Sequence, residues 1–291
     1  HPNIIAIVDF GEEDDGTLFL AMEYVPGVNL GELLSAEADV DLKRLLHICA
    51  QICLALEVAH LAGVIHGDIK PSNVMIESVH GNPDFVKVVD FGISKFIRTD
   101  ETPHEQDEQL LGSFNFMAPE QILSRPVTPQ TDIYGIGALL FSGLTRRLPF
   151  YGDTDAELLK AIVQQPLPDP RALCPELDVP IQLCSIIQRA MAKDPKSRHD
   201  SAADLRRELI ELSQIHSDSL EMDAVEFLFP EEELLEQSLA TPPKPQGSAA
   251  SPWDIYSDVV LARPSDQYAK LHDINPGEVS QKSLRNFTRH K

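Results

Sequence analysis

The segment His66–Asn73, which reads HGDIKPSN, decides how the rest of this chain is interpreted. It places Asp68, Lys70 and Asn73 in one short polar loop, between a long helical pattern and the apolar run VMIE. The glycine, proline and serine of the loop are ordinary turn residues. A turn does not require a carboxylate, an ammonium group and an amide at these spacings, so the three side chains are candidates for a functional site.

The composition indicates a folded protein without a basic surface. The chain has 291 residues, of which 43% are hydrophobic and 24% charged, and its net charge is −22. The length allows one large domain or two small ones. The negative charge argues against nucleic acid as a partner, because such binding needs a basic face. We find no leader pattern and no long apolar run, so we expect neither a signal peptide nor a membrane span, and a cytoplasmic location.

The four cysteines give no sign of a metal site. Cys49, Cys53, Cys174 and Cys184 form no CxxC pair. A zinc site would need further Cys or His residues nearby. We therefore expect buried thiols in a reducing compartment.

The first third of the chain alternates strand and helix patterns. Residues 3–10 and 17–25 are strand-like and flank a polar turn, which predicts a hairpin. Residues 41–62 carry apolar side chains at helical spacing, and Gly63 is a suitable stop. Residues 74–77 and 85–91 predict a second short hairpin.

From residue 131 onward the patterns are helical. Residues 131–145 are apolar all round, which indicates a buried helix. Thr154 and Glu157 form the pattern of a capping box at the start of the next helix. The segments 180–192 and 201–213 complete the helical set.

The composition shifts after residue 213. Residues 217–236 hold many acids without Lys or Arg, and a Pro-, Ser- and Ala-rich stretch follows. We expect 214–291 to be a largely disordered acidic tail. A tail that docks on a basic partner is the alternative, and the sequence does not identify that partner.

The side chains of the 66–73 loop suit phosphoryl transfer, in which a protein mainly positions groups and neutralises charge. Asp68 can accept the proton of an attacking hydroxyl, and Lys70 can place a cation near the moving phosphoryl group. Asn73 can give an amide oxygen to a metal ion. Asp90 ends the next strand, and the predicted hairpin would bring its carboxylate back beside Asn73.

These residues also carry a family resemblance. HGDIKPSN, DFG at 90–92 and APE at 118–120 resemble the eukaryotic-like (Hanks-type) serine/threonine protein kinases of bacteria. TDIYGIG, KDPKSR and AMEYVPGVNL resemble that family's buried helix, its late arginine segment and its hinge. The resemblance covers residues 1–213 and implies an α+β, protein-kinase-like fold. Residues 1–25 would be a remnant hairpin of the N-lobe, and residues 26–213 a mainly helical C-lobe.

The resemblance implies transfer of the γ-phosphoryl group of ATP to Ser or Thr hydroxyls of a protein substrate, with Mg²⁺. The implied catalytic residues are the base Asp68, the cation Lys70 and the hydroxyl of Ser113. The implied metal ligands are Asn73 and Asp90. The implied nucleotide contacts are the backbone of Glu23 and Val25, the gatekeeper Met22, Asn29 at the ribose and Met75 under the adenine.

The resemblance also implies three structural contacts. An apolar spine of Ile7, His66 and Phe91 would join the lobes. Asp132 would hold the base of that spine. Glu120 and Arg198 would form a largely buried ion pair.

The chain departs from the family pattern at Gly67, where the family usually has an arginine that receives a phosphorylated loop. Thr99 and Thr102 would then lack their usual electrostatic receiver if they were phosphorylated. Acidic residues surround both threonines. We therefore expect weak control of this loop by phosphorylation.

A second departure concerns the first part of the domain. We find no Gly-rich loop, no strand lysine and no helix glutamate before the hinge, and HPNII resembles the strand that follows that helix. We expect the sequence to begin inside the small lobe and the fragment alone to be inactive. The alternative is a pseudokinase or scaffold that lacks these parts.

Overall fold

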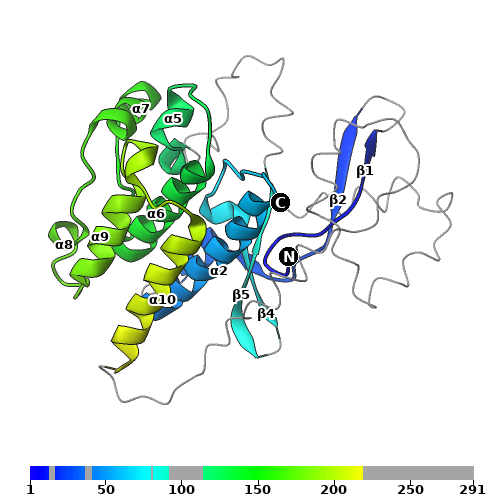
Figure 1. Cartoon of the computed structure of the whole chain (residues 1–291), viewed down its shortest axis with the longest axis horizontal. Helices are drawn as coiled ribbons and strands as arrows, with labels where there is room; N and C mark the ends of the chain where they lie inside the picture. The colour runs from blue at the N-terminus through cyan, green and yellow to red at the C-terminus, as the bar shows by residue number, and fades with distance from the viewer. Residues whose placement is uncertain (13–16, 37–40, 80, 92–113, 219–291) are drawn as a thin grey trace.

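A computed structural model describes residues 1–12, 17–36, 41–79, 81–91 and 114–218 of the chain. Helices make up most of this part, and two small sheets lie toward one end (Figure 1). The helices share one large apolar core, which also includes the buried faces of the second sheet.

The centre of the helical body is α2 (Leu42–Leu61), as the pattern over 41–62 predicted. It packs against α6 (Pro129–Thr145) and α10 (Ala202–Asp218) (Figure 1). Gly63 follows it with a φ of 78°, a conformation that favours glycine at helix ends. By length and composition α2 could cross a membrane, but 78% of its apolar window is buried inside the fold, as in the core helix of a folded domain.

The other predicted helices are confirmed. The all-round apolar segment is α6, which is buried along most of its length. The segments after it form α7 (Asp155–Gln164), α9 (Ile181–Ala190) and α10. The backbone of α10 stays helical to Asp218, five residues beyond the expected boundary at 213. Residues 219–291, which hold most of the expected tail, lie outside the described residues.

Several short elements were not predicted, because elements of three to seven residues carry no readable period. They include α1 (Leu30–Ala36), α5 (Pro119–Ile122) and α8 (Pro170–Leu173). Single 3-10 turns cover Pro71–Asn73, Phe114–Phe116 and Pro195–Ser197.

The expected cap of α7 is present in a modified form. Thr154 Oγ1 accepts a hydrogen bond from the Glu157 N–H at 3.3 Å. The Glu157 carboxylate reaches the N–H of Asp153, one residue before the one a capping box would use, at 2.9 Å.

The second predicted hairpin is confirmed as β4 (Val74–Val79) and β5 (Asn82–Val88), which pair antiparallel. A two-residue strand, β3 (Val28–Asn29), adds to the other edge of β4, so the order is β3-β4-β5. This sheet carries the loop before β4 and the turn after β5, which are the two halves of the candidate site.

The first predicted hairpin is confirmed in part, as β1 (Ile7–Glu12) and β2 (Leu18–Met22). Its predicted start was wrong, because residues 3–5 leave the hairpin and run beside β5. Ile4 forms a parallel bridge with Val88, and the Ile5 N–H donates to the Val88 carbonyl at 3.0 Å. There Ile4 and Ile5 are both 6% exposed, a burial that the hairpin does not offer its own residues.

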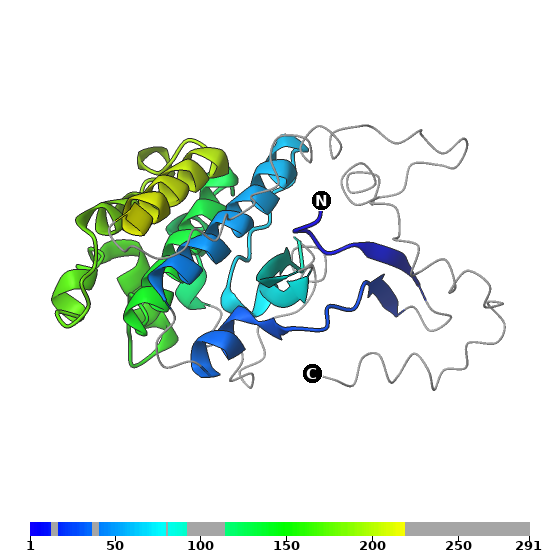
Figure 2. The same cartoon turned by 90° about the horizontal axis from the view of Figure 1, so that it is seen from below.

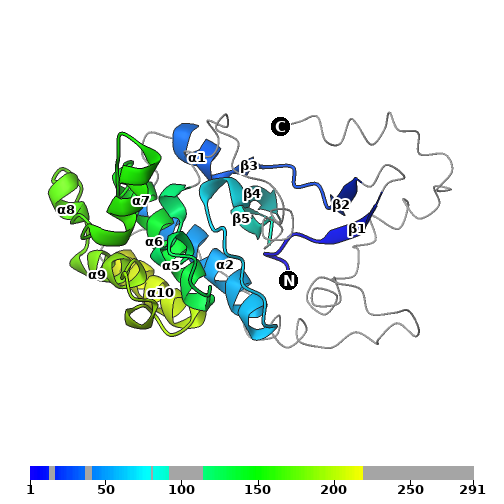
Figure 3. The ribbon, with the colours of Figure 1, turned by 90° about the horizontal axis from the view of Figure 1, so that it is seen from above.

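The β1–β2 hairpin stands apart from the helices, at the opposite end of the molecule from α8 (Figures 2 and 3). Its side chains Val8, Phe10 and Leu18 are 63%, 53% and 64% exposed. The hairpin therefore presents apolar side chains to solvent. The cysteines also match expectation, since Cys49, Cys53 and Cys174 are buried and all four are free thiols.

Candidate active site

Asp68, Lys70 and Asn73 meet at a single carboxylate oxygen. Lys70 Nζ lies 2.8 Å from Asp68 Oδ2, and Asn73 Nδ2 donates to the same oxygen at 3.0 Å. Asn73 Nδ2 also donates to the Asp68 carbonyl at 2.8 Å. The spacing that singled out these residues in the sequence thus brings them together.

The other oxygen of Asp68, Oδ1, accepts no hydrogen bond from the part of the chain that the structure describes. The side chain of Asp68 is 32% exposed, so solvent or a substrate can reach it. A carboxylate that is held at one oxygen and open at the other is suited to accept a proton from a group that approaches its open oxygen.

The buried carboxylate of Asp132, in the first turn of α6, fixes the backbone of this loop. Asp132 Oδ2 accepts from the His66 N–H at 2.9 Å, and Oδ1 accepts from the Gly67 N–H at 2.6 Å. His60, at the end of α2, also contacts Oδ2 at 2.7 Å. The expectation that Asp132 holds the base of the spine is confirmed.

His66 connects the loop to the turn after β5. Its Nδ1 accepts from the Asp68 N–H at 3.2 Å, and its Nε2 lies 2.8 Å from the Val89 carbonyl, which can only accept. The ring proton therefore resides on Nε2. The rings of His66 and Phe91 lie 4.6 Å apart, which confirms that part of the expected spine. Ile7, the third expected member, lies in β1, and its place in the spine stays a prediction.

A backbone hydrogen bond of the preceding residue, Val89, holds Asp90 near Asn73. The Val89 N–H donates to the Asn73 carbonyl at 3.0 Å, and Asp90 follows directly. Asp90 is exposed and has a φ of 63°, an uncommon conformation for a residue with a side chain. Unusual backbone of this kind concentrates at functional sites. The predicted return of the second hairpin toward Asn73 is confirmed, and the role of the Asp90 side chain stays a prediction.

The oxygen ligands of Asn73 and Asp90 fit a hard divalent cation. Both hydrogen bonds of the Asn73 amide group to Asp68 use its nitrogen, so its oxygen faces away from Asp68. The contact of that oxygen, with Ser72 Oγ, is long at 3.5 Å. An amide oxygen and an exposed carboxylate are ligands that Mg²⁺ accepts. The described residues hold no group of three or more His, Cys, Asp or Glu side chains, which is the pattern of other metal sites.

Glu120 and Arg198 form the expected ion pair below this site. Arg198 Nη1 and Nη2 reach the two Glu120 oxygens at 2.7 and 2.8 Å. The side chains are 0% and 3% exposed. Burial alone would raise the pKa of Glu120, but the hydrogen bonds and charge of Arg198 outweigh it and hold that pKa below its ordinary value.

Comparison with known proteins agrees with this geometry. The sequence pattern described as "Protein kinase domain" matches residues 1–210, which is well over half of the chain. The chain belongs to the protein kinase family.

Curated relatives of the chain are bacterial kinases. It is 35% identical over 263 residues to the serine/threonine-protein kinase pkn3 of Myxococcus xanthus, covering 90% of this chain and 47% of the relative. It is 37% identical over 209 residues to the serine/threonine-protein kinase PrkC of Bacillus subtilis, covering 72% of this chain and 31% of the relative. The chain thus spans less than half the length of these relatives.

The fold is that of a protein kinase. A crystal structure of Rad53 in complex with AMP-PNP superposes with a TM-score of 0.59 at 26% identity, covering 72% of this chain and 50% of that one. Kinases of this family act on ATP with a divalent metal ion and on protein substrates.

Glu23–Val25, where the resemblance placed the hinge, connects β2 to the segment before β3. Val25 is buried in a small apolar cluster with Ile5 and Val89, and Met75 of β4 packs against it. Met75 therefore lies beside Val25, and its expected place under the adenine stays a prediction. Met22 ends β2 opposite Ile7 and is 38% exposed.

Asn29 has a structural task that was not expected of it. Its Oδ1 accepts from the Glu32 N–H at 3.0 Å, and its own N–H donates to the Glu32 carboxylate at 3.0 Å. This reciprocal pair caps α1. The ribose contact expected of Asn29 stays a prediction.

Ser113, Thr99 and Thr102 lie outside the described residues, so their expected roles stay predictions. Gly67 has a φ of 71°, and its carbonyl accepts from Gln121 Nε2 of α5 at 2.7 Å. Sequence reasoning missed Gln121, as it missed His60. Both residues contact this region from elements that are distant in the sequence. Their residue types alone do not indicate these contacts.

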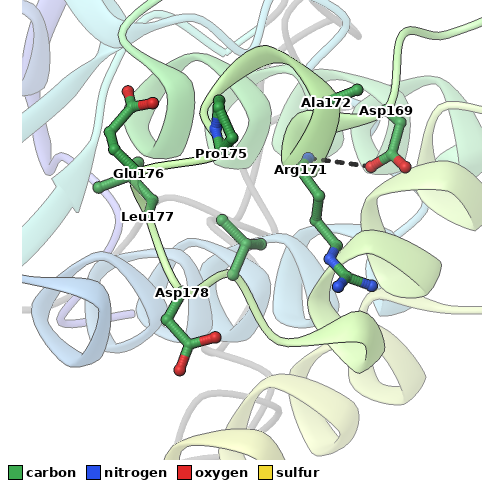
Figure 4. A pocket seen from close by; sticks show the side chains of 8 residues that line it. Asp169, Arg171, Ala172, Pro175, Glu176, Leu177 and Asp178 are labelled. Carbon is green, nitrogen blue, oxygen red and sulfur yellow. Dashed lines mark hydrogen bonds between the residues drawn. The ribbon is translucent and has the colours of Figure 1, made fainter.

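A pocket of about 550 Å³ lies away from this site, around α8 (Figure 4). Its polar lining includes Arg171 and the acids Asp169, Glu176 and Asp178. Asp169 is engaged as the cap of α8, where it accepts from the Arg171 N–H at 2.9 Å. None of the residues of the loop before β4 lines this pocket.

Proposed function

We propose that this chain carries the catalytic loop of a serine/threonine kinase, which transfers the γ-phosphoryl group of ATP to Ser or Thr hydroxyls of proteins. The observation that supports this proposal most strongly is the Asp68 carboxylate, held at Oδ2 by Lys70 and Asn73 and open at Oδ1.

In this proposal the substrate hydroxyl lies against Asp68 Oδ1. Its oxygen attacks the γ-phosphorus as the bond to the β,γ-bridging oxygen breaks, and its proton passes to Asp68. The contacts with Lys70 and Asn73 keep the carboxylate from rotating, so its open oxygen stays directed at the hydroxyl. Lys70 also supplies a positive charge to the transferring group.

Asn73 and Asp90 are the proposed ligands of Mg²⁺. The ion, when bound, neutralises charge on the phosphate oxygens. Asn73 performs two tasks at once, since its nitrogen orients Asp68 while its oxygen remains available for the metal. The hinge backbone at Glu23 and Val25 is proposed to bind the adenine above Met75.

Replacement of Asp68 tests the base directly. We expect Asp68→Asn to lower phosphoryl transfer by at least about 10²-fold, because general base catalysis contributes about 10²–10⁴-fold. ATP affinity should change less than about threefold. Transfer is measured on the full-length protein with γ-labelled ATP and a generic protein acceptor, and affinity is measured by titration calorimetry.

Asp178→Asn is the matched control, because Asp178 is an exposed acid near α8 and far from the loop. It should retain wild-type transfer and affinity. Undiminished transfer by Asp68→Asn would remove Asp68 from the base role. Loss of ATP affinity in that variant would instead make it a binding residue.

The alternative proposal is a pseudokinase or scaffold. The exposed β1–β2 hairpin favours it, because an apolar face of this kind suits an interaction surface. An intact base and two metal ligands favour the enzyme, since a scaffold needs neither. Failure of the full-length protein to hydrolyse ATP or to transfer its γ-phosphoryl group would support the scaffold.

We further propose a cytoplasmic location and a protein partner that presents Ser or Thr, with no nucleic-acid partner. The net charge of −22 supports the last point. The partner of the acidic tail is unknown.

A further inference from the structure

The hinge contains an irregular strand pair between Ala6 and Glu23. The Glu23 N–H donates to the Ala6 carbonyl at 2.9 Å. The Ala6 N–H donates to the Glu23 side chain, at Oε1, at a distance of 3.0 Å. In a regular antiparallel pair of this kind the two residues exchange both backbone hydrogen bonds. Here the carboxylate of Glu23 takes the place of its own carbonyl.

Because the Glu23 carboxylate pairs with Ala6, the backbone carbonyl of Glu23 is released from the strand pair. The Glu23 carbonyl accepts no hydrogen bond from any residue that the structure describes, and the Val25 N–H donates to none of them. The two groups lie in one short segment, next to the apolar cluster of Ile5, Val25, Val89 and Met75. An acceptor and a donor beside an apolar floor match the polar edge of a flat heterocycle.

Lys87 of β5 fixes the carboxylate in this position. Its Nζ lies 2.7 Å from Glu23 Oε1, the same oxygen that accepts from Ala6. The two side chains are 15% and 17% exposed, so water screens the pair only in part. Lys87 faces Met75 in the β4–β5 register, so the lysine comes from the strand beside the proposed adenine floor.

Glu77 gives an independent sign that Lys87 serves two carboxylates. The pKa of Glu77 is raised, mainly because its carboxyl group is partly buried. The charge of Lys87 lowers this pKa, and the charge of Glu23 raises it. Without Lys87 the two carboxylates would repel each other, and Glu23 would lose the cation that holds it against Ala6.

We propose that Glu23 and Lys87 are positioning residues, which keep the Glu23 carbonyl out of the strand pair so that it can accept a hydrogen bond from the 6-amino group of adenine. This inference rests on the proposed nucleotide-binding function. It assigns a role to the Glu23 side chain, in addition to that of its backbone, and to a lysine on a different strand.

The test compares two nucleotides that differ by one donor. ATP carries the 6-amino group, and purine riboside triphosphate lacks it while retaining the acceptor at N1. Affinities of the wild-type chain and its variants for both are measured by calorimetry. One hydrogen bond is worth about tenfold in affinity, so the wild-type chain should prefer ATP by about that factor.

Two variants should abolish this preference. In Glu23→Ala the Ala6 N–H can pair with the freed carbonyl, which completes the strand pair and withdraws the acceptor from the nucleotide. In Lys87→Met the carboxylate loses its cation. In both, the ratio of affinities for ATP and the analogue should fall below about twofold. A merely structural defect would weaken both nucleotides equally and leave their ratio unchanged.

Lys87→Arg keeps the ion pair and should restore the wild-type ratio. Arg189→Met breaks an exposed ion pair on α9 and should have no effect. Amide exchange at the Ala6 N–H adds a measurement that needs no nucleotide. In Glu23→Ala this N–H should stay protected, because it then donates to the backbone carbonyl of position 23.

The outcomes separate the two proposals. A tenfold preference that persists in Glu23→Ala and Lys87→Met overturns the positioning role and leaves nucleotide binding intact. Equal wild-type affinities for both nucleotides overturn the use of the carbonyl. A full-length wild-type protein that binds neither nucleotide overturns the proposed function, and the positioning role fails with it.

Discussion

Arg198 shows how a single residue can be buried with its charge. Its side chain is 0% exposed, yet it donates to both Glu120 oxygens and to the carbonyls of Ala192, Gln130 and Lys193. Thr131 Oγ1 donates to Glu120 as well, at 2.8 Å. A buried charge that keeps all its partners is tolerated, and one that loses them is strongly destabilising.

We expect Arg198→Met to lower the free energy of unfolding by about 3–5 kcal/mol, because it leaves Glu120 buried without its cation. The measurement is urea denaturation followed by circular dichroism. Arg189→Met is the matched control, since the Arg189–Glu208 pair is exposed at 43% and 34%, and it should cost less than about 1 kcal/mol. Equal losses in the two variants would contradict the account of this ion pair.

At the residue scale, the sequence predicted what depends on local spacing and missed what depends on tertiary contacts. Asp68 and Asn73 are five positions apart in one loop, so their meeting could be foreseen. The cap made by Asn29 needs α1, which is too short to show a period. The Glu23 carboxylate needs Lys87, which is 64 positions away, and no local pattern indicates that pair.

At the scale of elements, long helices were predicted well and pairing between distant segments was not. The apolar period over 41–62 is long enough to define α2. Residues 3–5 are as strand-like in composition as residues 7–10, but their partner is β5. A strand pattern identifies an extended segment without its neighbour, so the parallel bridge could not be predicted.

The packing of α10 on α2 can be tested with matched leucine-sized side chains. Leu205 is 0% exposed in the main core, and Ile215 of the same helix is 59% exposed. Leu205→Ala should lower the free energy of unfolding by about 2–5 kcal/mol through the cavity it leaves. Ile215→Ala should cost less than about 1 kcal/mol. Comparable losses, measured by chemical denaturation, would mean that α10 does not pack as described.

For the whole molecule, buried ionisable groups predict acid sensitivity. Burial lowers the pKa of His199 and of His47 below the ordinary 6.5, and the Arg198 contacts hold the pKa of Glu120 below 4.5. In each case, as the pH falls, the group binds its proton at a higher pH in the unfolded chain than in the folded one. Stability is therefore complete above the ordinary pKa and is lost as the pH falls through the folded one.

We expect the free energy of unfolding to decline from about pH 6.5 through the histidines, and more steeply below about pH 4.5 through Glu120. Urea titrations at about pH 7.5, 6.5, 5 and 3.5 measure this decline. Replacing His47 and His199 together by Gln should flatten the upper part and leave the lower part. A double variant with the wild-type slope between pH 6.5 and 5 would contradict the assignment.

The central claim for the whole molecule is that Asp68, Asn73 and Asp90 converge on the terminal phosphate of one nucleotide. It is tested most directly by a crystal structure of the full-length protein bound to AMP-PNP and Mn²⁺, an anomalous scatterer that accepts the same oxygen ligands as Mg²⁺. The account predicts an anomalous peak between Asn73 Oδ1 and the Asp90 carboxylate, with the γ-phosphate facing Asp68. A nucleotide and metal bound elsewhere, or Asp90 directed away from a metal on Asn73, would contradict it.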